Sequence, residues 1–218
     1  MKRQQLVPAM MVGIAIITAT VLWISQAHLQ GSAIKMASAM PTSSPPVLSK
    51  LIDFELANQD GRVMNRKSLL GRVQIINFIF TTCPGVCPLL TNRMKLIEKN
   101  TRHLGDKIHF VSISVDPETD QPAVLKAYGE KHEVDFSRWD FLTGSLDSVK
   151  EVVVSGFKSA MNKTRVPASD EESPDLMQIT HGEHFVIVDP QGQLRAFKTA
   201  NTMKEVEAIV ELASKLQP

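Results

Sequence analysis

Phe80-Thr81-Thr82-Cys83-Pro84-Gly85-Val86-Cys87-Pro88 contains both cysteines of the 218-residue chain. A fold held together by disulfides would need more cysteines, spread along the sequence, so this pair is reserved for one site. The run from Val73 to Phe80 is apolar and β-branched except at two positions, and Leu89 to Leu104 carries apolar residues at helical spacing. The sequence therefore predicts that the cysteines lie where a buried strand turns into a helix.

This position favours thiolate chemistry. The first N–H groups of a helix are unpaired and carry partial positive charge, which stabilises a thiolate as a nucleophile or as a ligand for a soft metal. If the segment is helical, the spacing of four places Cys83 and Cys87 on one face, with Cβ atoms about 5–6 Å apart. The pair could then clamp one metal ion or, with modest adjustment, close as a disulfide. Neither Pro84 nor Pro88 blocks a first helical turn.

Two later segments complete a pattern with the cysteine motif. Ser114-Val115-Asp116-Pro117-Glu118-Thr119-Asp120 comes first, and His181 then precedes Phe185-Val186-Ile187-Val188-Asp189-Pro190-Gln191-Gly192. From Leu51 to the C-terminus, the three motifs in this order resemble the Sco/SenC family. The resemblance implies a thioredoxin-like domain, anchored in a membrane, that binds copper through Cys83, Cys87 and His181. It also implies a role in metallating the binuclear copper centre of cytochrome c oxidase.

The chain departs from the commonest family pattern at two positions. Many members have an acidic residue where this chain has Gly85 or Thr180. Neither position is a copper ligand in the family, but both lie beside the expected site. Thioredoxin-fold oxidoreductases also carry a cis-proline facing their cysteines, and this chain has Thr180-His181-Gly182 in that region. A ligand in place of a substrate-clamping proline favours metal binding.

Several residues compete for a role in the site. Two thiolates and one imidazole suit Cu(I) and can hold Cu(II), whereas closed zinc sites normally have four protein ligands. His184 is an alternative to His181, and if the strand has begun at this point, at most one of them points into the site, because residues three apart face opposite sides of a strand. Asp116 and Asp120 resemble catalytic carboxylates but are expected to form a loop and a helix cap. The remaining histidines have no partner motif and are expected at the surface or in packing, namely His28, His103, His109 and His132.

The N-terminal segment predicts a membrane anchor. Lys2 and Arg3 precede an apolar run from Leu6 to Ile24, which as a helix would be about 28 Å long, close to the hydrocarbon thickness of a bilayer. The alternative is a signal peptide cleaved after Ser25-Gln26-Ala27 or Ala37-Ser38-Ala39, although signal peptides have a shorter apolar core. The two basic residues predict a cytoplasmic N-terminus. Because no Arg-rich presequence comes before the anchor, we expect a bacterial inner membrane with the domain in the periplasm.

Composition sets limits on partners and domains. The chain has 24 basic and 23 acidic residues and lacks a basic stripe with interleaved aromatics, which argues against nucleic acid as a partner. Residues 1–24 are predicted as the anchor and residues 25–49, rich in Ser, Ala, Pro and Met, as a flexible linker. Residues 50–218 are predicted as one domain, large enough to bury a core without disulfides.

Strands and helices are predicted to alternate along this domain. An opening hairpin turns at Asn58-Gln59-Asp60-Gly61. Predicted strands follow at 73–80, 108–115, 140–142, 185–188 and 193–197, and predicted helices at 89–102, 121–131, 145–157 and 202–216. This order is typical of a thioredoxin-like α/β layer. Met161 to Gln178 has no periodicity and is predicted to be a long loop that delivers His181 to the sheet edge.

Three functions fit these residues. The first is a copper metallochaperone, a carrier rather than an enzyme in the turnover sense, which passes copper to the copper-bearing subunit of cytochrome c oxidase or to another periplasmic copper chaperone. The second is a thiol-disulfide oxidoreductase acting on cysteines of such a protein, and the third is a redox or copper sensor. His181 separates the first two, because a carrier needs it while a dithiol reductase needs only the cysteine pair.

Overall fold

The computed structural model describes residues 19–26, 45–159, 161–166, 176–181 and 183–217. It divides into two units, Met1–Ser43 and Ser44–Pro218. Residues 19–26 of the first unit are helical. Most of the predicted anchor, including Lys2 and Arg3, and most of the predicted linker lie outside the described residues. Within the described part of the chain, no helix is both long enough and apolar enough to cross a membrane.

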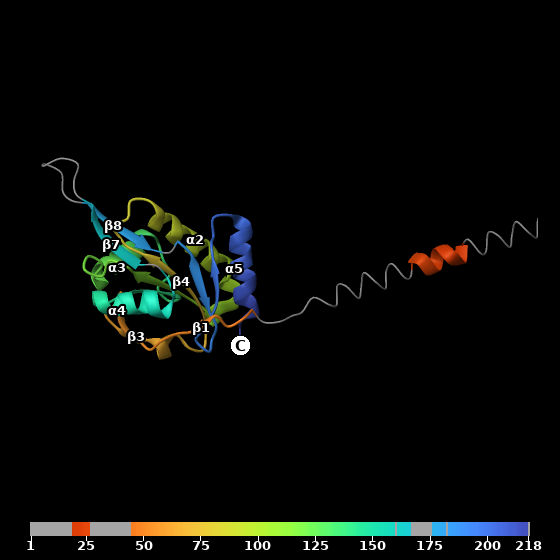
Figure 1. Ribbon diagram of the computed structural model, residues 1–218, viewed down its shortest axis with the longest axis horizontal. Helices are drawn as coiled ribbons and strands as arrows, with labels where there is room; N and C mark the ends of the chain where they lie inside the picture. Colours follow the sequence, from red (N-terminus) through yellow and green to blue (C-terminus); the bar gives the residue numbers. More distant parts are fainter. Residues whose placement is uncertain (1–18, 27–44, 160, 167–175, 182, 218) are drawn as a thin grey trace, which may run out of the picture. The chain divides into compact units, whose positions relative to one another are not determined.

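The second unit is built around an eight-stranded sheet with the order β1-β10-β9-β4-β5-β6-β2-β3 (Figure 1). Three central strands, β4, β5 and β6, are parallel to one another, and β9 is antiparallel to β4. The strands are β1 (Ser49–Lys50), β2 (Glu55–Asn58), β3 (Val63–Asn65), β4 (Val73–Ile79), β5 (Ile108–Ser114), β6 (Trp139–Thr143), β9 (Phe185–Val188) and β10 (Gln193–Lys198).

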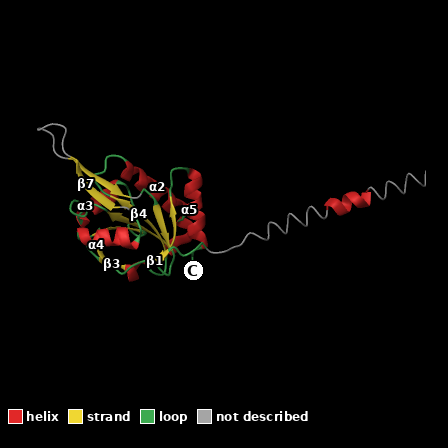
Figure 2. Ribbon diagram, viewed as in Figure 1, coloured by secondary structure: helices red, strands yellow, loops and turns green. Residues whose placement is uncertain are grey.

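Helices lie on both sides of this sheet (Figure 2). They are α2 (Val86–Asn100), α3 (Pro122–Lys131), α4 (Leu146–Lys150) and α5 (Met203–Lys215). Short 3-10 helices occupy Arg66–Leu69 and Arg102–Lys107, and a π-helical turn at Glu151–Gly156 continues α4. Helices α2 and α5 run side by side, as Figure 1 shows.

The central strand β4 explains why the sheet has two cores. All seven of its residues are buried, and successive side chains of a strand point to opposite faces. Ile75 and Ile79 pack in a core with α2, α3 and α5, whereas Ile76 and Phe78 pack in a second core with α4. Cys87 belongs to the first core, so the cysteine motif lies on the α2 side of the sheet.

The predicted strands, the opening hairpin and three of the four predicted helices are present within one to three residues of their expected bounds. The remaining helix was predicted over 145–157, but only Leu146–Lys150 (α4) is α-helical. Its continuation is π-helical, with the N–H of Phe157 donating to the carbonyl of Val152 (2.9 Å). The run of three valines at 152–154 and Gly156 both have low helix propensity, which fits a distorted last turn.

The predicted long loop over Met161 to Gln178 is wrong at both of its ends. Strand β7 (Met161–Val166) pairs with β8 (Leu176–His181) in a separate antiparallel sheet, with Met161 opposite His181. Polar residues alternate poorly with apolar ones in both strands, so the hairpin has no clear period of two. Residues 167–175 lie outside the described part of the chain.

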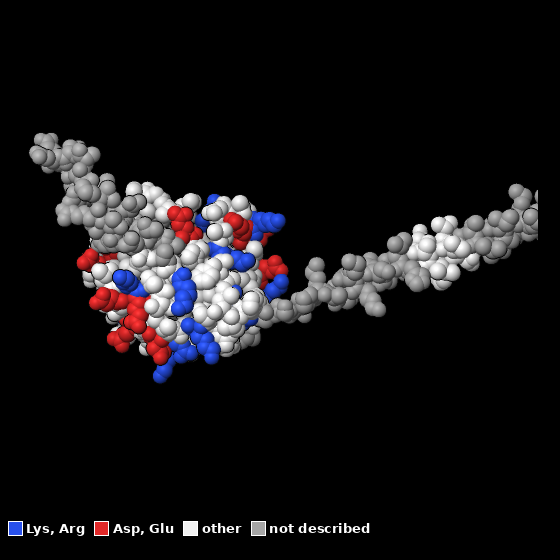
Figure 3. Space-filling model, in the orientation of Figure 1, with Lys and Arg blue, Asp and Glu red and all other residues white. Residues whose placement is uncertain are grey.

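The start of the compact unit also differs from the predicted linker boundary at residue 49. Ser49 and Lys50 form β1 against β10, and the guanidinium of Arg195 donates to the carbonyl of Pro45 (2.9 Å). The surface of this unit carries both signs of charge, interspersed over the face in view (Figure 3). No stripe of basic side chains crosses this face.

Candidate thiol and metal site

The two cysteines lie in the turn between β4 and α2, which we call the cysteine loop (residues 80–87). Helix α2 begins at Val86, three residues earlier than predicted, with Gly85 as an N-cap that makes no side-chain hydrogen bond. Cys87 therefore lies in the first helical turn, whereas Cys83 lies before the helix. The two cysteines do not share a helix face, as the spacing of four had suggested; the loop brings their side chains together instead.

The sulfur of Cys83 takes the place of the missing cap. The N–H of Cys87 donates to Cys83 Sγ (3.4 Å), so an unpaired amide of the helix N-terminus is satisfied by sulfur. Burial opposes ionisation of this half-buried thiol, but the backbone N–H groups of Cys87, Gly85 and Val86 outweigh it and lower the pKa of Cys83 below its usual value. The sequence predicted thiolate character for both cysteines, and the lowered pKa agrees with it for Cys83 alone.

Cys87 has the opposite character. Its side chain has no exposed surface, and burial raises its pKa well above the usual range, although the N–H of Phe80 donates to its sulfur (3.5 Å). The neighbouring Cys83 and the charge of Asp120 raise the pKa further. Without a bound metal, Cys87 is therefore held as a neutral thiol beneath Cys83.

The carboxylate of Asp120 was predicted to cap α3, and this prediction is wrong. Gln121 is the N-cap of α3, without a side-chain bond. Asp120 is fully buried and its Oδ2 accepts from the N–H of Thr81 (3.0 Å) and from the hydroxyl of Ser114 (2.6 Å). The hydroxyl of Thr81 donates to Oδ1. Asp120 thus binds the cysteine loop, a contact that sequence spacing alone could not indicate.

Asp116 has the predicted role in a loop. Its carbonyl accepts from the N–H groups of Thr119 (3.1 Å) and Asp120 (2.9 Å). This turn folds the chain back after β5 and carries the Asp120 carboxylate toward the cysteine loop.

The predicted ligand His181 ends β8, and its ring lies outside what the structure describes. Its competitor His184 is described: its ring contacts Phe78 (centroids 6.1 Å apart) and Phe197 (5.0 Å) edge to face. Phe78 belongs to the core on the α4 side, whereas Cys87 belongs to the core on the α2 side. His184 therefore has a packing role on the face opposite the buried cysteine.

The other histidines within the described residues fit their predicted surface or packing roles. His103 is exposed, and His132 packs against the ring of Tyr128 (4.4 Å). His109 is buried between Gln74 and Asp140, with Nδ1 2.9 Å from the former and Nε2 3.1 Å from the latter. His28 lies outside the described residues.

Tyr128 is a buried neighbour of the site that the sequence did not single out. Its hydroxyl lies 2.9 Å from that of Thr91 on α2, one turn after Cys87. Burial raises the pKa of Tyr128 to about 12, with smaller contributions from the charges of Cys87, Cys83 and Asp120. It remains a neutral hydroxyl that ties α3 to α2.

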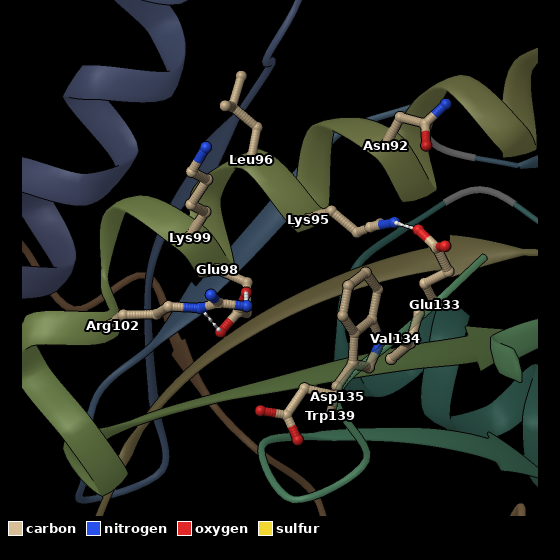
Figure 4. Close-up of a pocket in the computed structure, with 10 residues that line it drawn as sticks. All are labelled: Asn92, Lys95, Leu96, Glu98, Lys99, Arg102, Glu133, Val134, Asp135 and Trp139. Carbon is tan, nitrogen blue, oxygen red and sulfur yellow. Dashed lines mark hydrogen bonds and ion pairs between the residues drawn. The ribbon is translucent and has the colours of Figure 1, made fainter.

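Two pockets lie elsewhere on the domain. One, of about 300 Å³, lies between the second half of α2 and the chain before β6 and includes Glu98, Arg102 and Trp139 (Figure 4). The other, of about 370 Å³, includes His109 and Asp140. Neither of these two pockets is lined by a residue of the cysteine loop.

The donor set fits a soft metal ion. Two sulfurs of contrasting exposure adjoin each other, and thiolates select Cu(I) over harder ions. Among the described side chains, no group of three or more His, Cys, Asp or Glu is arranged to hold a metal. The side chain of the predicted third ligand, His181, is not among these side chains.

The fold and the site define a class: an α/β domain of thioredoxin type whose reactive dithiol lies between a central strand and a helix. The family model for SCO1/SenC matches residues 45–217. The SCO1 protein homolog of Bacillus subtilis is 33% identical over 150 residues, which cover 68% of this chain and 73% of that protein. The chain belongs to the SCO1/SenC family.

Solved structures agree with this assignment. BsSco, described as having a disulfide switch and as a member of the Sco family of cytochrome c oxidase assembly proteins, has a TM-score of 0.61 and 28% identity, covering 78% of this chain and 96% of that one. Yeast Sco1 with copper bound has a TM-score of 0.61 and 28% identity, covering 75% of this chain and 87% of that one. The predicted thioredoxin-like α/β fold is confirmed.

Proposed function

We propose that this protein is a copper metallochaperone that carries one copper ion, as cargo, on Cys83, Cys87 and His181 and assists assembly of cytochrome c oxidase. The observation that carries the proposal is the dithiol at the strand-to-helix turn of a Sco-family domain, with Cys83 Sγ accepting the N–H of Cys87 (3.4 Å). Copper bound to yeast Sco1 supports the metal. The description of BsSco as an oxidase assembly protein supports the pathway.

The described backbone around His181 supports its assignment as the third ligand. Strand β9 is antiparallel to β4, with Val186 opposite Ile76, and the ring of His184 reaches Phe78 near the end of β4. The cysteine loop begins two residues after Phe78. Three residues of chain, which span at most about 10 Å, separate His181 from His184, and this short separation in the chain is what supports proposing His181 as the third ligand.

The two thiols have different tasks in this proposal. Cys83 is half-buried and is the more readily ionised thiol, so it can exchange with a thiolate or imidazole of a donor or recipient protein. Cys87 is buried and becomes a ligand only when it loses its proton to bulk solvent or to a partner base as the metal binds. Copper binding is therefore expected to release protons.

The same proposal includes an anchor at the N-terminus. Lys2, Arg3 and the apolar run from Leu6 to Ile24 have the charge and length of a single membrane span with a cytoplasmic N-terminus. We assign the copper-binding unit to the periplasmic face of a bacterial inner membrane. The recipient would then be the copper-bearing oxidase subunit or another periplasmic copper chaperone.

The second candidate function is a thiol-disulfide oxidoreductase, and the contact between the two cysteine side chains favours it. A dithiol with one low-pKa member can reduce a partner disulfide by thiolate attack and then close on itself. Such a protein would use Cys83 and Cys87 without His181.

The experiment that separates the two compares His181→Ala, Cys83→Ser and Cys87→Ser strains for oxidase activity, alongside the redox state of the thiols. A carrier loses copper binding and oxidase assembly with His181→Ala, yet keeps a pair that cycles between dithiol and disulfide. Exposed His103→Ala is the matched histidine control and should behave as wild type. Normal oxidase activity with His181→Ala, combined with inactive cysteine variants, would replace the carrier proposal by the reductase.

A further inference from the structure

We propose that Asp120 is a positioning residue for the cysteine pair: its buried carboxylate clamps Thr81 to the end of β5 and so holds Cys83 against the start of α2. The inference deepens the proposed function and takes from it that Cys83 and Cys87 are the working pair. It depends neither on the identity of the metal nor on His181.

The clamp joins segments that are far apart in the chain. Thr81 and Asp120 are 39 residues apart, and they share two hydrogen bonds, one from the backbone N–H and one from the hydroxyl of Thr81. Two bonds to one carboxylate fix both the position and the rotation of the peptide unit at Thr81. Cys83 follows two residues later, and its N–H bonds back to the carbonyl of Phe80 (3.2 Å).

The carboxylate is itself held rigidly. Ser114, the last residue of β5, donates to Asp120 Oδ2 (2.6 Å) and accepts from the N–H of Asp116 (3.1 Å). The N–H of Val115 continues the pairing with β4 by donating to the carbonyl of Ile79 (2.9 Å). The clamp therefore ties the cysteine loop to the two central strands of the sheet.

The hydrogen bonds of the buried Asp120 side chain go to Thr81 and Ser114 and indicate no role other than the clamp. It does not cap α3, whose N-cap is Gln121, and a buried carboxylate is costly unless donors surround it. Here two of the three donors come from the cysteine loop. The loop needs such support, because Thr82, Pro84 and Gly85 are exposed.

How well the fold positions Cys83 against Cys87 can be measured without copper, from the thiol-disulfide exchange equilibrium between the cysteine pair and glutathione. The protein dithiol plus glutathione disulfide gives the protein disulfide plus two glutathione thiols, so two electrons leave the protein and two protons move with them. The equilibrium constant is the effective concentration of one thiol at the other, which falls when the loop moves freely.

The test uses the full-length protein in mild detergent, and five variants. Asp120→Ala removes the clamp and should lower the equilibrium constant by about tenfold or more, since misplacement by about 1 Å can cost about a hundredfold. Asp120→Asn can keep all three bonds, with its oxygen accepting from Thr81 N–H and Ser114 and its amide donating to the Thr81 hydroxyl. This variant should stay within about twofold of wild type.

Asp189→Ala is the matched control, because Asp189 is also a buried carboxylate with several donors, in the turn between β9 and β10. It should reduce the stability of the fold and leave the glutathione equilibrium unchanged. If Asp120→Ala does not fold, Thr81→Val compared with Thr81→Ser tests one clamp bond, and only the valine variant should lower the equilibrium constant.

The results distinguish this inference from the proposed function. An unchanged equilibrium in Asp120→Ala or Thr81→Val, an equal loss in Asp120→Asn, or an equal loss in Asp189→Ala would each overturn the positioning role. None of these outcomes bears on whether His181 is required for copper carriage. Conversely, loss of the carrier proposal through the His181→Ala strain leaves the clamp measurement intact.

Discussion

Glu98 on α2 bonds two guanidinium groups that differ mainly in exposure, which allows a controlled prediction of stability. Arg138 Nη1 lies 2.8 Å from Glu98 Oε1, with side-chain exposures of 10% and 7%. Arg102 lies 3.2 Å from the same oxygen but is 64% exposed, and Figure 4 shows this second pair among the residues that line the pocket. Arg138 also lies over the ring of Phe110, 5.5 Å from its centroid.

We expect Arg138→Met to be strongly destabilising and Arg102→Met to be nearly silent. Without Arg138, the buried carboxylate of Glu98 keeps only the exposed guanidinium of Arg102 as a partner, and breaking a buried ion pair costs about 3–5 kcal/mol. With a urea slope of about 2 kcal/mol/M, the unfolding midpoint should fall by about 1.5–2.5 M. The exposed pair of Arg102 is screened by water, so its loss should not move the midpoint measurably.

The assay is urea unfolding followed by tryptophan fluorescence and circular dichroism, with a double variant to complete the cycle. Glu98→Gln combined with Arg138→Met removes both charges and should recover much of the lost stability, because the remaining groups no longer include a buried ion. Equal midpoints for Arg138→Met and Arg102→Met, or a double variant as unstable as the sum of the two single ones, would refute the reasoning.

The remaining predictions concern the thiols and the anchor. Pulse alkylation of the reduced protein should modify Cys83 first, because its lowered pKa supplies more thiolate at neutral pH. The rate at Cys83 should reach half its maximum at a pH below the ordinary thiol pKa, while Cys87 should react slowly as the pH rises. Equal alkylation rates of the two cysteines, measured by mass spectrometry of the peptides, would contradict this asymmetry. Cell fractionation should recover the protein in the inner membrane with its C-terminal unit accessible to protease from the periplasm, and a full-length domain in the cytosol, or an N-terminus mapped to His28, would contradict the topology or the anchor.

The sequence predicted the strand-to-helix position of the cysteines because β4 has an unmistakable signal. Every residue of Val73–Ile79 is buried, and a strand buried on both faces appears as a continuous apolar run. The amphipathic helix α5 could also be predicted from local sequence, since Thr202 and Glu205 at its start form a capping box. These elements depend on local patterns, and local patterns can be read from one sequence.

The β7–β8 hairpin and the role of Asp120 could not be predicted in this way. Most residues of β7 are polar, and polar residues interrupt the apolar ones in β8, so neither strict alternation nor an apolar run marks either strand. Asp120 precedes Gln121-Pro122, which is the usual position of a helix cap. Its real partner, Thr81, lies in another segment, and the contact exists only because β4 and β5 are neighbours in the sheet.

The asymmetry of the two thiols follows from where the helix begins, and it bears on how a carrier releases its cargo. Because α2 begins at Val86, Cys87 is carried into the core by the first turn, while Cys83 remains outside and caps that turn with its sulfur. If the protein carries copper as proposed, an incoming ligand would reach the Cys83 sulfur first, and Cys87 would hold the metal until that exchange had begun. A pair with equal exposure would lack this order, so the early start of α2 is the feature of the fold that most favours stepwise transfer.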